Sequence, residues 1–200
     1  MTTSGPLAEI LIDRASIRAR IGELAADLDD VFGGRGEPLF VSVLKGSTMF
    51  LADLVRTMRS TVAVDFLSIS AYAGGRGGVV RIVKDLDQSV EGRDVVIVED
   101  IVDTGLTLNY LRKTLGERLP SSLRTVALLN KTARRIVPVP VEYTGFEVPD
   151  VFVVGYGLDF QGRYRNYPDI LSVTDLPRLA NDPLLLVDPL FDPNTRSSGC

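Results

Sequence analysis

Residues 95–108 read VVIVEDIVDTGLTL, and this stretch decides the fold that the sequence predicts. It opens with four aliphatic residues in a row, which is typical of a strand buried on both faces of a parallel sheet. Three acids follow, Glu99, Asp100 and Asp103, and then a Thr-Gly turn. Leucines at helical spacing begin at Leu108. We therefore expect a central strand, a turn and an amphipathic helix in direct succession.

Strands and helices alternate on both sides of this stretch. Short apolar runs predict strands, and apolar residues at helical spacing predict helices. The expected helices cover residues 17–31, 50–58 and 108–119, and the expected strands cover residues 38–44, 62–69, 79–83, 126–129, 143–146 and 151–154. This alternation predicts an α/β domain with a central, mostly parallel sheet flanked by helices.

Two segments interrupt the pattern. The glycine-rich residues 71–78 have little to bury, so they predict a mobile hairpin loop between two antiparallel strands. From Pro168 onward proline recurs and regularity fades. We expect a single domain over residues 1–180 and a partly disordered C-terminal extension over residues 181–200.

The composition limits the classes of function. The net charge is −4, so nothing suggests attraction to nucleic acid or to a membrane surface. The one cysteine is Cys200, residues 1–10 lack the pattern of a signal peptide, and no apolar run approaches the ~20 residues of a membrane span. We expect a cytoplasmic protein without disulfides. The chain contains 0 histidines, so any proton transfer must use an Asp, Glu, Lys or Tyr.

The three acids lie at the carboxyl end of the expected central strand, where open α/β sheets bind ligands. Adjacent carboxylates repel each other unless a cation, a ligand hydroxyl or a shared proton relieves them. The N–H groups of residues 103–107 and two threonine hydroxyls can surround a phosphate. A plainer interpretation, in which Asp103 or Thr104 only caps the helix, explains one residue and not the set. The stretch therefore indicates a site for a magnesium-bound sugar phosphate.

The EDIVDTG segment at residues 99–105 resembles the phosphoribosyl pyrophosphate signature of type I phosphoribosyltransferases, most closely their hypoxanthine-guanine branch. The resemblance extends over about residues 38–167. It implies the type I phosphoribosyltransferase fold, with a small hood beside the main sheet. It also implies a purine salvage reaction that uses Mg²⁺. In that reaction the 5-phosphoribosyl group passes from phosphoribosyl pyrophosphate to hypoxanthine or guanine, giving IMP or GMP and pyrophosphate.

The same resemblance assigns a role to each residue of the central stretch. Glu99 and Asp100 would bind the ribose hydroxyls, directly or through magnesium. Asp103 would accept the proton from N7 of the purine. The 5′-phosphate would lie in the turn made by Asp103, Thr104, Gly105, Leu106 and Thr107.

A second motif, at Lys45 and Gly46, matches the pyrophosphate loop of this family. In relatives the peptide bond between the residues matching Leu44 and Lys45 is often cis. Arg165 matches an arginine that reaches the pyrophosphate. Taken alone, residues 45–47 favour the plainer interpretation of an ordinary strand-to-helix turn with an exposed lysine; the central motif favours the pyrophosphate loop.

The purine contacts come from two later segments. Lys131 matches a lysine that donates to O6 of the purine, Phe152 matches a residue that stacks on the base, and Val153 would present main-chain groups to the base edge. Asp159 matches a second magnesium position. The plainer interpretations are a solvated lysine, a core phenylalanine and a turn aspartate. Residues 134–135, both arginine, are expected to be surface or interface charges.

The glycine-rich loop departs from the family pattern. The family usually has Ser-Tyr there, whereas this chain has Ala71-Tyr72, with Ser70 one place earlier. Tyr72 can still shield the site, but Ala71 cannot supply a hydroxyl, so closure is expected to be looser or to use another donor.

Two other functions remain open at this point. One is a regulator on the same fold that binds nucleic acid, which the acidic charge disfavours. The other is an enzyme whose acceptor is xanthine or a pyrimidine. The sequence does not separate hypoxanthine from guanine. We expect small-molecule partners, no nucleic acid, no membrane, and a homodimer or homotetramer.

Overall fold

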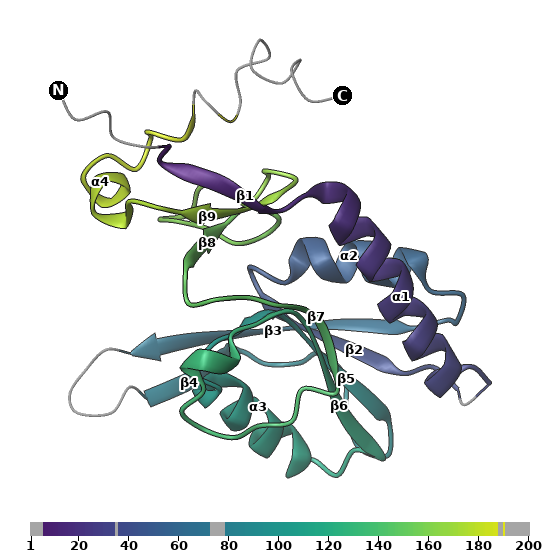
Figure 1. Ribbon diagram of the computed structural model, residues 1–200. Coiled ribbons are helices and arrows are strands. Elements are labelled where there is room, and N and C mark those ends of the chain that lie inside the picture. Colours follow the sequence, from purple (N-terminus) through teal and green to yellow (C-terminus); the bar gives the residue numbers. More distant parts are fainter. Residues whose placement is uncertain (1–5, 35, 73–78, 188–189, 191–200) are drawn as a thin grey trace, which may run out of the picture. The chain divides into compact units, whose positions relative to one another are not determined.

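The computed structural model describes residues 6–34, 36–72, 79–187 and 190. The chain divides into two compact units, Ala19–Asp150 and the combination of Met1–Arg18 with Val151–Cys200 (Figure 1). Within the described residues, no helix is long and apolar enough to cross a membrane.

The larger unit is built on a six-stranded sheet with the order β4-β3-β2-β5-β6-β7. All neighbouring strands are parallel except β3 and β4, which are antiparallel as predicted. The expectation of a mostly parallel sheet is therefore confirmed. The strands are β2 (Leu39–Leu44), β3 (Ala63–Tyr72), β4 (Val79–Lys84), β5 (Asp94–Val102), β6 (Ser122–Asn130) and β7 (Tyr143–Glu147).

The central strand β5 is buried as its sequence predicts. All four residues from Val95 to Val98 have no exposed surface, and Val95 and Ile97 share a core cluster with Leu108, Leu111 and Leu115. The strand is longer than expected, however. It pairs with β6 as far as Val102, so Glu99 and Asp100 are part of the strand and do not follow it.

Helices lie on both faces of the sheet (Figure 1). They are α1 (Arg14–Phe32), α2 (Thr48–Thr57) and α3 (Leu106–Gly116). Helix α1 extends over the predicted range, and Gly33 and Gly34 follow its last residue. Asp13 caps the start of the helix by accepting the N–H groups of Ala15 and Ser16, each at 2.9 Å.

The strand order creates a switch point between β2 and β5. Helix α2 leads from β2 to its neighbour β3 on one side, and α3 leads from β5 to β6 on the other side. The loops that leave these two strands therefore diverge at the carboxyl end of the sheet. Ligands of open α/β sheets bind in the crevice at such a point.

The smaller unit contains an antiparallel sheet of three strands, β1 (Ala8–Ile12), β9 (Ile170–Val173) and β8 (Phe152–Val154), in that order. A short helix, α4 (Leu176–Asn181), follows. Here the expectation that regularity fades after residue 168 is wrong. Ala8 pairs with Val173, and no local pattern can reveal a pairing between residues so far apart in the sequence. The prediction of one domain over residues 1–180 stays a prediction.

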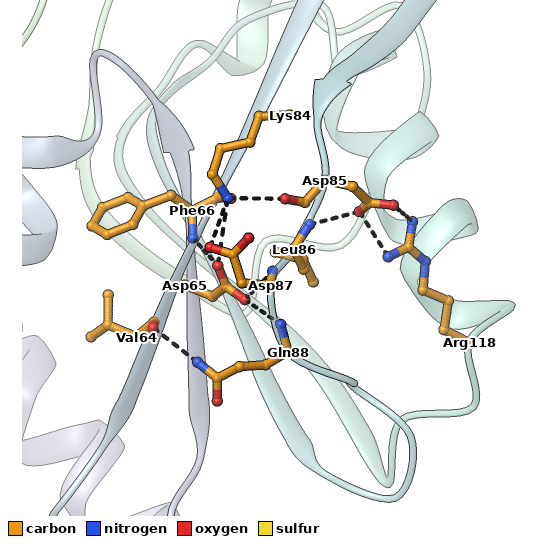
Figure 2. A network of polar contacts seen from close by, with 9 residues as sticks. All are labelled: Val64, Asp65, Phe66, Lys84, Asp85, Leu86, Asp87, Gln88 and Arg118. Atoms are coloured by element: carbon orange, nitrogen blue, oxygen red, sulfur yellow. Dashed lines mark hydrogen bonds and ion pairs between the residues drawn. The ribbon is translucent and has the colours of Figure 1, made fainter.

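A polar network fastens the connection between β4 and β5 to the larger unit (Figure 2). Its centre is Asp65 on β3, which is 3% exposed and accepts the N–H groups of Asp87 at 2.8 Å and Gln88 at 2.9 Å. Lys84 Nζ donates to the carbonyl oxygens of Phe66 and Asp85, each at 3.0 Å. The backbone groups of this connection thus have partners inside the protein.

Replacing Asp65 by Ala is expected to lower the free energy of unfolding by roughly 2–4 kcal/mol, because it leaves two N–H groups of the connection without their acceptor. Urea unfolding of the variant would measure the loss. Asp87→Ala is the matched control, since the Asp87 side chain is 80% exposed and pairs with Lys84 at the surface. Equal losses in the two variants would contradict the role given to Asp65.

Candidate active site

The loop after β2 begins the candidate site. The peptide bond between Leu44 and Lys45 is cis, as it often is in the family that the sequence resembles. Lys45 is exposed and Gly46 is buried. Ser47 Oγ donates to the carbonyl oxygen of Val43 at 2.6 Å and lies 2.7 Å from Ser42 Oγ. These buried hydroxyls join the loop to the strand that precedes it.

This loop and the acid end of β5 lie in contact. A Cβ atom added to Gly46 would stand 1.4 Å from Oδ2 of Asp100, which no side chain could tolerate without a shift. Asp100 also accepts the N–H group of Ile101 at 2.7 Å. The structure therefore brings the lysine–glycine loop and the second acid together at the switch point of the sheet.

Glu99 is the most buried acid of the candidate site, with 5% of its surface exposed. Burial raises the pKa of its carboxyl group well above the usual value, and the neighbouring charge of Asp100 raises that pKa further. A carboxylate in this position needs a cation or hydroxyl donors to be ionised at low cost. The position of Glu99 therefore suits a ligand that supplies a cation or hydroxyl donors.

The turn between β5 and α3 leaves the start of α3 open. Gly105 is the N-cap residue, with a φ angle of 84° and no capping hydrogen bond from a side chain. Thr104 Oγ1 lies 3.4 Å from the backbone nitrogen of Leu106, which is a long hydrogen bond. Gly105, and not Asp103 or Thr104, is thus the N-cap residue, and Thr104 contributes one long contact to the start of the helix. The first N–H groups of α3 can instead bind an anion.

The segment of residues 131–137 packs against this turn. The carbonyl oxygen of Thr104 accepts the N–H groups of Ile136 and Val137, at 2.9 and 3.1 Å. The N–H group of Lys131 donates to the carbonyl oxygen of Val102 at 2.9 Å. Lys131 is only 5% exposed, which excludes the plainer interpretation of a solvated lysine. This lysine is thus held beside the acids at the carboxyl end of β5.

Of the two arginines in this segment, Arg134 is exposed, in line with the prediction of a surface charge, whereas Arg135 is half-buried. Arg134 Nε lies 3.2 Å from Oδ1 of Asp103. Arg135 packs against Gly105, where an added Cβ would stand 3.0 Å from Arg135 Cδ. One guanidinium nitrogen of Arg135 donates to Asn130, and the other, Nη1, is buried without a hydrogen bond from the described residues. The feature of the sequence that could have indicated these contacts is that the two arginines follow Lys131 by three and four residues.

The predicted residues of the smaller unit also lie together. Phe152 and Phe160 form an edge-to-face pair with 5.7 Å between ring centroids, and Val153 is buried. Asp159 pairs through Oδ1 with Arg165 Nη2 at 2.6 Å, and its Oδ2 accepts the N–H group of Gly162 at 2.7 Å. The two residues assigned to magnesium and to pyrophosphate are thus ion-paired with each other.

Arg165 has a further contact within the same loop. Its Nη1 donates to the carbonyl oxygen of Gly157 at 2.7 Å. Binding of a pyrophosphate or of a metal would therefore exchange these internal contacts for contacts with the ligand. The roles assigned to Arg165 and Asp159 stay predictions.

Tyr72 is the last residue of β3 and pairs through its backbone with Val79 of β4. The sequence predicts a mobile loop over residues 71–78; β3 extends to residue 72, and residues 73–78 lie outside the described residues. The proposed closing role of Tyr72 stays a prediction.

The family model for the phosphoribosyl transferase domain matches residues 8–161. The chain belongs to the phosphoribosyltransferase family. Hypoxanthine phosphoribosyltransferase of Salmonella typhimurium is 47% identical to this phosphoribosyltransferase over 168 residues, covering 82% of this chain and 94% of the relative. Hypoxanthine-guanine phosphoribosyltransferase of Bacillus subtilis is 43% identical over 166 residues, covering 82% and 92%.

Solved structures agree with the family assignment. A hypoxanthine-guanine phosphoribosyltransferase from Bacillus anthracis, with a HEPES molecule in its active site, superposes with a TM-score of 0.78. It has 40% sequence identity, and the match covers 82% of this chain and 98% of the other. The hypoxanthine phosphoribosyltransferase of Trypanosoma cruzi gives 0.77 and 42%, covering 82% and 95%. The type I fold expected for this phosphoribosyltransferase is confirmed.

Proposed function

We propose that this phosphoribosyltransferase acts in purine salvage. It transfers the 5-phosphoribosyl group from phosphoribosyl pyrophosphate to hypoxanthine or guanine, giving IMP or GMP and pyrophosphate. The observation that carries the proposal is the placement of Lys131, a buried lysine joined through its backbone to Val102, one residue before Asp103. A 6-oxopurine needs a hydrogen-bond donor for O6 and a base for N7. A lysine and a carboxylate that lie at the same edge of the sheet can supply both. The names of the relatives support the same substrates.

The reaction displaces pyrophosphate from C1 of the ribose. Charge develops on the sugar and on the departing pyrophosphate, and Lys45 and Arg165 would stabilise the latter. The N–H groups at the start of α3 would hold the 5′-phosphate. Asp103 would accept the N7 proton while Lys131 donates to O6. A carboxylate base is consistent with a chain that has 0 histidines.

Magnesium fits the acids at the end of β5. Within the described part of the chain, no group of three or more acids, histidines or cysteines could hold a metal by itself. Mg²⁺ is usually held by one or two carboxylates together with substrate phosphates and water. Glu99 and Asp100 would contribute those carboxylates, and Asp159 a second position. When bound, magnesium would neutralise the charge of the pyrophosphate.

A panel of bases tests the proposed acceptors. We expect turnover with hypoxanthine or guanine in the presence of phosphoribosyl pyrophosphate and magnesium, and much less with xanthine, adenine or uracil. A steady-state assay of each base measures this preference, and omission of magnesium is the control. Preference for xanthine or a pyrimidine would contradict the purine roles of Lys131, Phe152 and Val153.

The remaining expectations concern the oligomeric state, the cellular location and the nucleic-acid-binding alternative. We propose a homodimer or homotetramer in the cytoplasm, on the ground of the family resemblance. The nucleic-acid-binding alternative is not favoured, since the net charge is −4 and the relatives are named as enzymes.

A further inference from the structure

Arg134 makes contacts that neither the sequence nor the proposed reaction accounts for. It ends the short 3₁₀ helix Thr132–Arg134. Its Nε lies 3.2 Å from Oδ1 of Asp103, and its Nη1 lies 3.4 Å from Oδ1 of Asp150. The guanidinium group thus lies between two carboxylates, one after β5 and one after β7. All three residues belong to the larger unit.

The two oxygens of Asp103 differ in their surroundings. Oδ1 is buried and forms no hydrogen bond of good geometry with the described residues, so the nearby guanidinium is the group that compensates its charge. No hydrogen bond or ion pair with Oδ2 is found in the described part of the chain. When a cation holds one oxygen of a carboxylate, the other oxygen can take only a restricted set of orientations.

We propose that Arg134 is a positioning residue for Asp103. It holds Oδ1, so that Oδ2 receives the proton from the purine. This inference rests on the proposed function, in which Asp103 is the base. In the transfer step the N9–C1 bond forms, the bond from C1 to the pyrophosphate oxygen breaks, and its electron pair leaves with the pyrophosphate. The N7–H proton moves to Oδ2, while Arg134 stays on Oδ1.

The plainer interpretation of this contact is a surface ion pair of little consequence. The side chains of Arg134 and Asp103 are 48% and 38% exposed, and exposed pairs contribute little to stability. The two interpretations therefore differ in what they predict. A surface pair changes nothing in catalysis, whereas a positioning pair changes turnover without much change in stability, because catalysis is sensitive to small displacements of the base.

Arg134→Gln tests the proposal in the full chain. We expect kcat to fall by about tenfold or more, with the KM for phosphoribosyl pyrophosphate within about twofold of wild type, because the base moves while the phosphate turn is kept. Arg134→Lys keeps the charge and should recover part of the lost kcat. Arg56→Gln is the matched control, since Arg56 also pairs with an acid, Asp53, on the exposed face of α2.

A double-mutant cycle distinguishes positioning from a general disturbance. In an Asp103→Asn background, Arg134→Gln should reduce the residual kcat by less than about twofold, because there is no base left to position. An equal loss in both backgrounds would overturn the proposal, and so would wild-type kcat in Arg134→Gln alone. If the wild-type chain itself shows no transfer to any purine, the proposed function fails, and this result is separate from the two others.

Discussion

Replacing Asp103 by Asn is expected to lower kcat by about 10²–10⁴-fold, because the neutral amide cannot accept the purine proton. The side chain keeps its size, and the contacts that hold the turn are made by the backbone of Thr104, so the phosphate turn should keep its shape. Steady-state kinetics with hypoxanthine would measure the loss of turnover. Calorimetric titration with magnesium and phosphoribosyl pyrophosphate, without a base, should give an affinity close to that of wild type.

The possible outcomes of that experiment assign different roles to Asp103. Turnover near the wild-type value would exclude Asp103 as the base. Loss of binding together with loss of turnover would make Asp103 part of the phosphate site and not of the proton transfer. Since the chain has 0 histidines, Glu99 and Asp100 would then be the next acids to examine as bases.

Replacing Glu99 by Gln is expected to raise the stability of the ligand-free protein and to lower its turnover. The pKa of Glu99 is raised well above 4.5 in the folded protein by its burial and by the charge of Asp100. In the unfolded chain the carboxyl group ionises at its usual pKa. As the pH rises from that usual pKa towards the raised one, the unfolded state loses its proton first, and the folded state becomes less stable. Glutamine has no proton to lose and avoids this cost.

The ligand-free variant should therefore unfold at a temperature higher than wild type by at least about 2 °C at neutral pH. The difference should disappear near pH 4, where wild-type Glu99 is protonated in both states. Turnover should fall by about 10–100-fold, since a charged hydrogen-bonding partner of the ribose or magnesium is lost. Thermal unfolding at a series of pH values and kinetics at neutral pH measure the two effects.

Glu91→Gln is the matched control for this experiment, because Glu91 is exposed. It should shift neither the unfolding temperature nor the turnover. A stability difference between Glu99→Gln and wild type that stays constant from pH 4 to pH 8 would contradict the account, since a buried ionisable group cannot produce it.

The central unit could be predicted from the sequence because its signals are local. A buried parallel strand, a turn and an amphipathic helix each have their own residue pattern, and residues 95–116 present the three in succession. The loop at Lys45 and the loop at Asp103 belong to strands β2 and β5, and the alternation of strands and helices was sufficient to place both at one edge of a sheet.

The parts that could not be predicted depend on contacts between distant residues. Strand β1 exists because Ala8 reaches Val173, and Asp65 has its role because Asp87 and Gln88 return to it. The same holds for Arg134, whose sequence neighbours suggest only a charged loop. Its partner, Asp103, lies 31 positions earlier and becomes visible only in the folded chain.

The central claim is that the chain joins a purine to a phosphoribosyl group with release of pyrophosphate. Phosphorus NMR of a mixture of the protein, magnesium, phosphoribosyl pyrophosphate and hypoxanthine follows that transfer directly. We expect the signals of IMP and pyrophosphate to grow in equal amounts, and neither to form when hypoxanthine is omitted. Substrate that stays unchanged, or that is hydrolysed at the same rate without the base, would contradict the account.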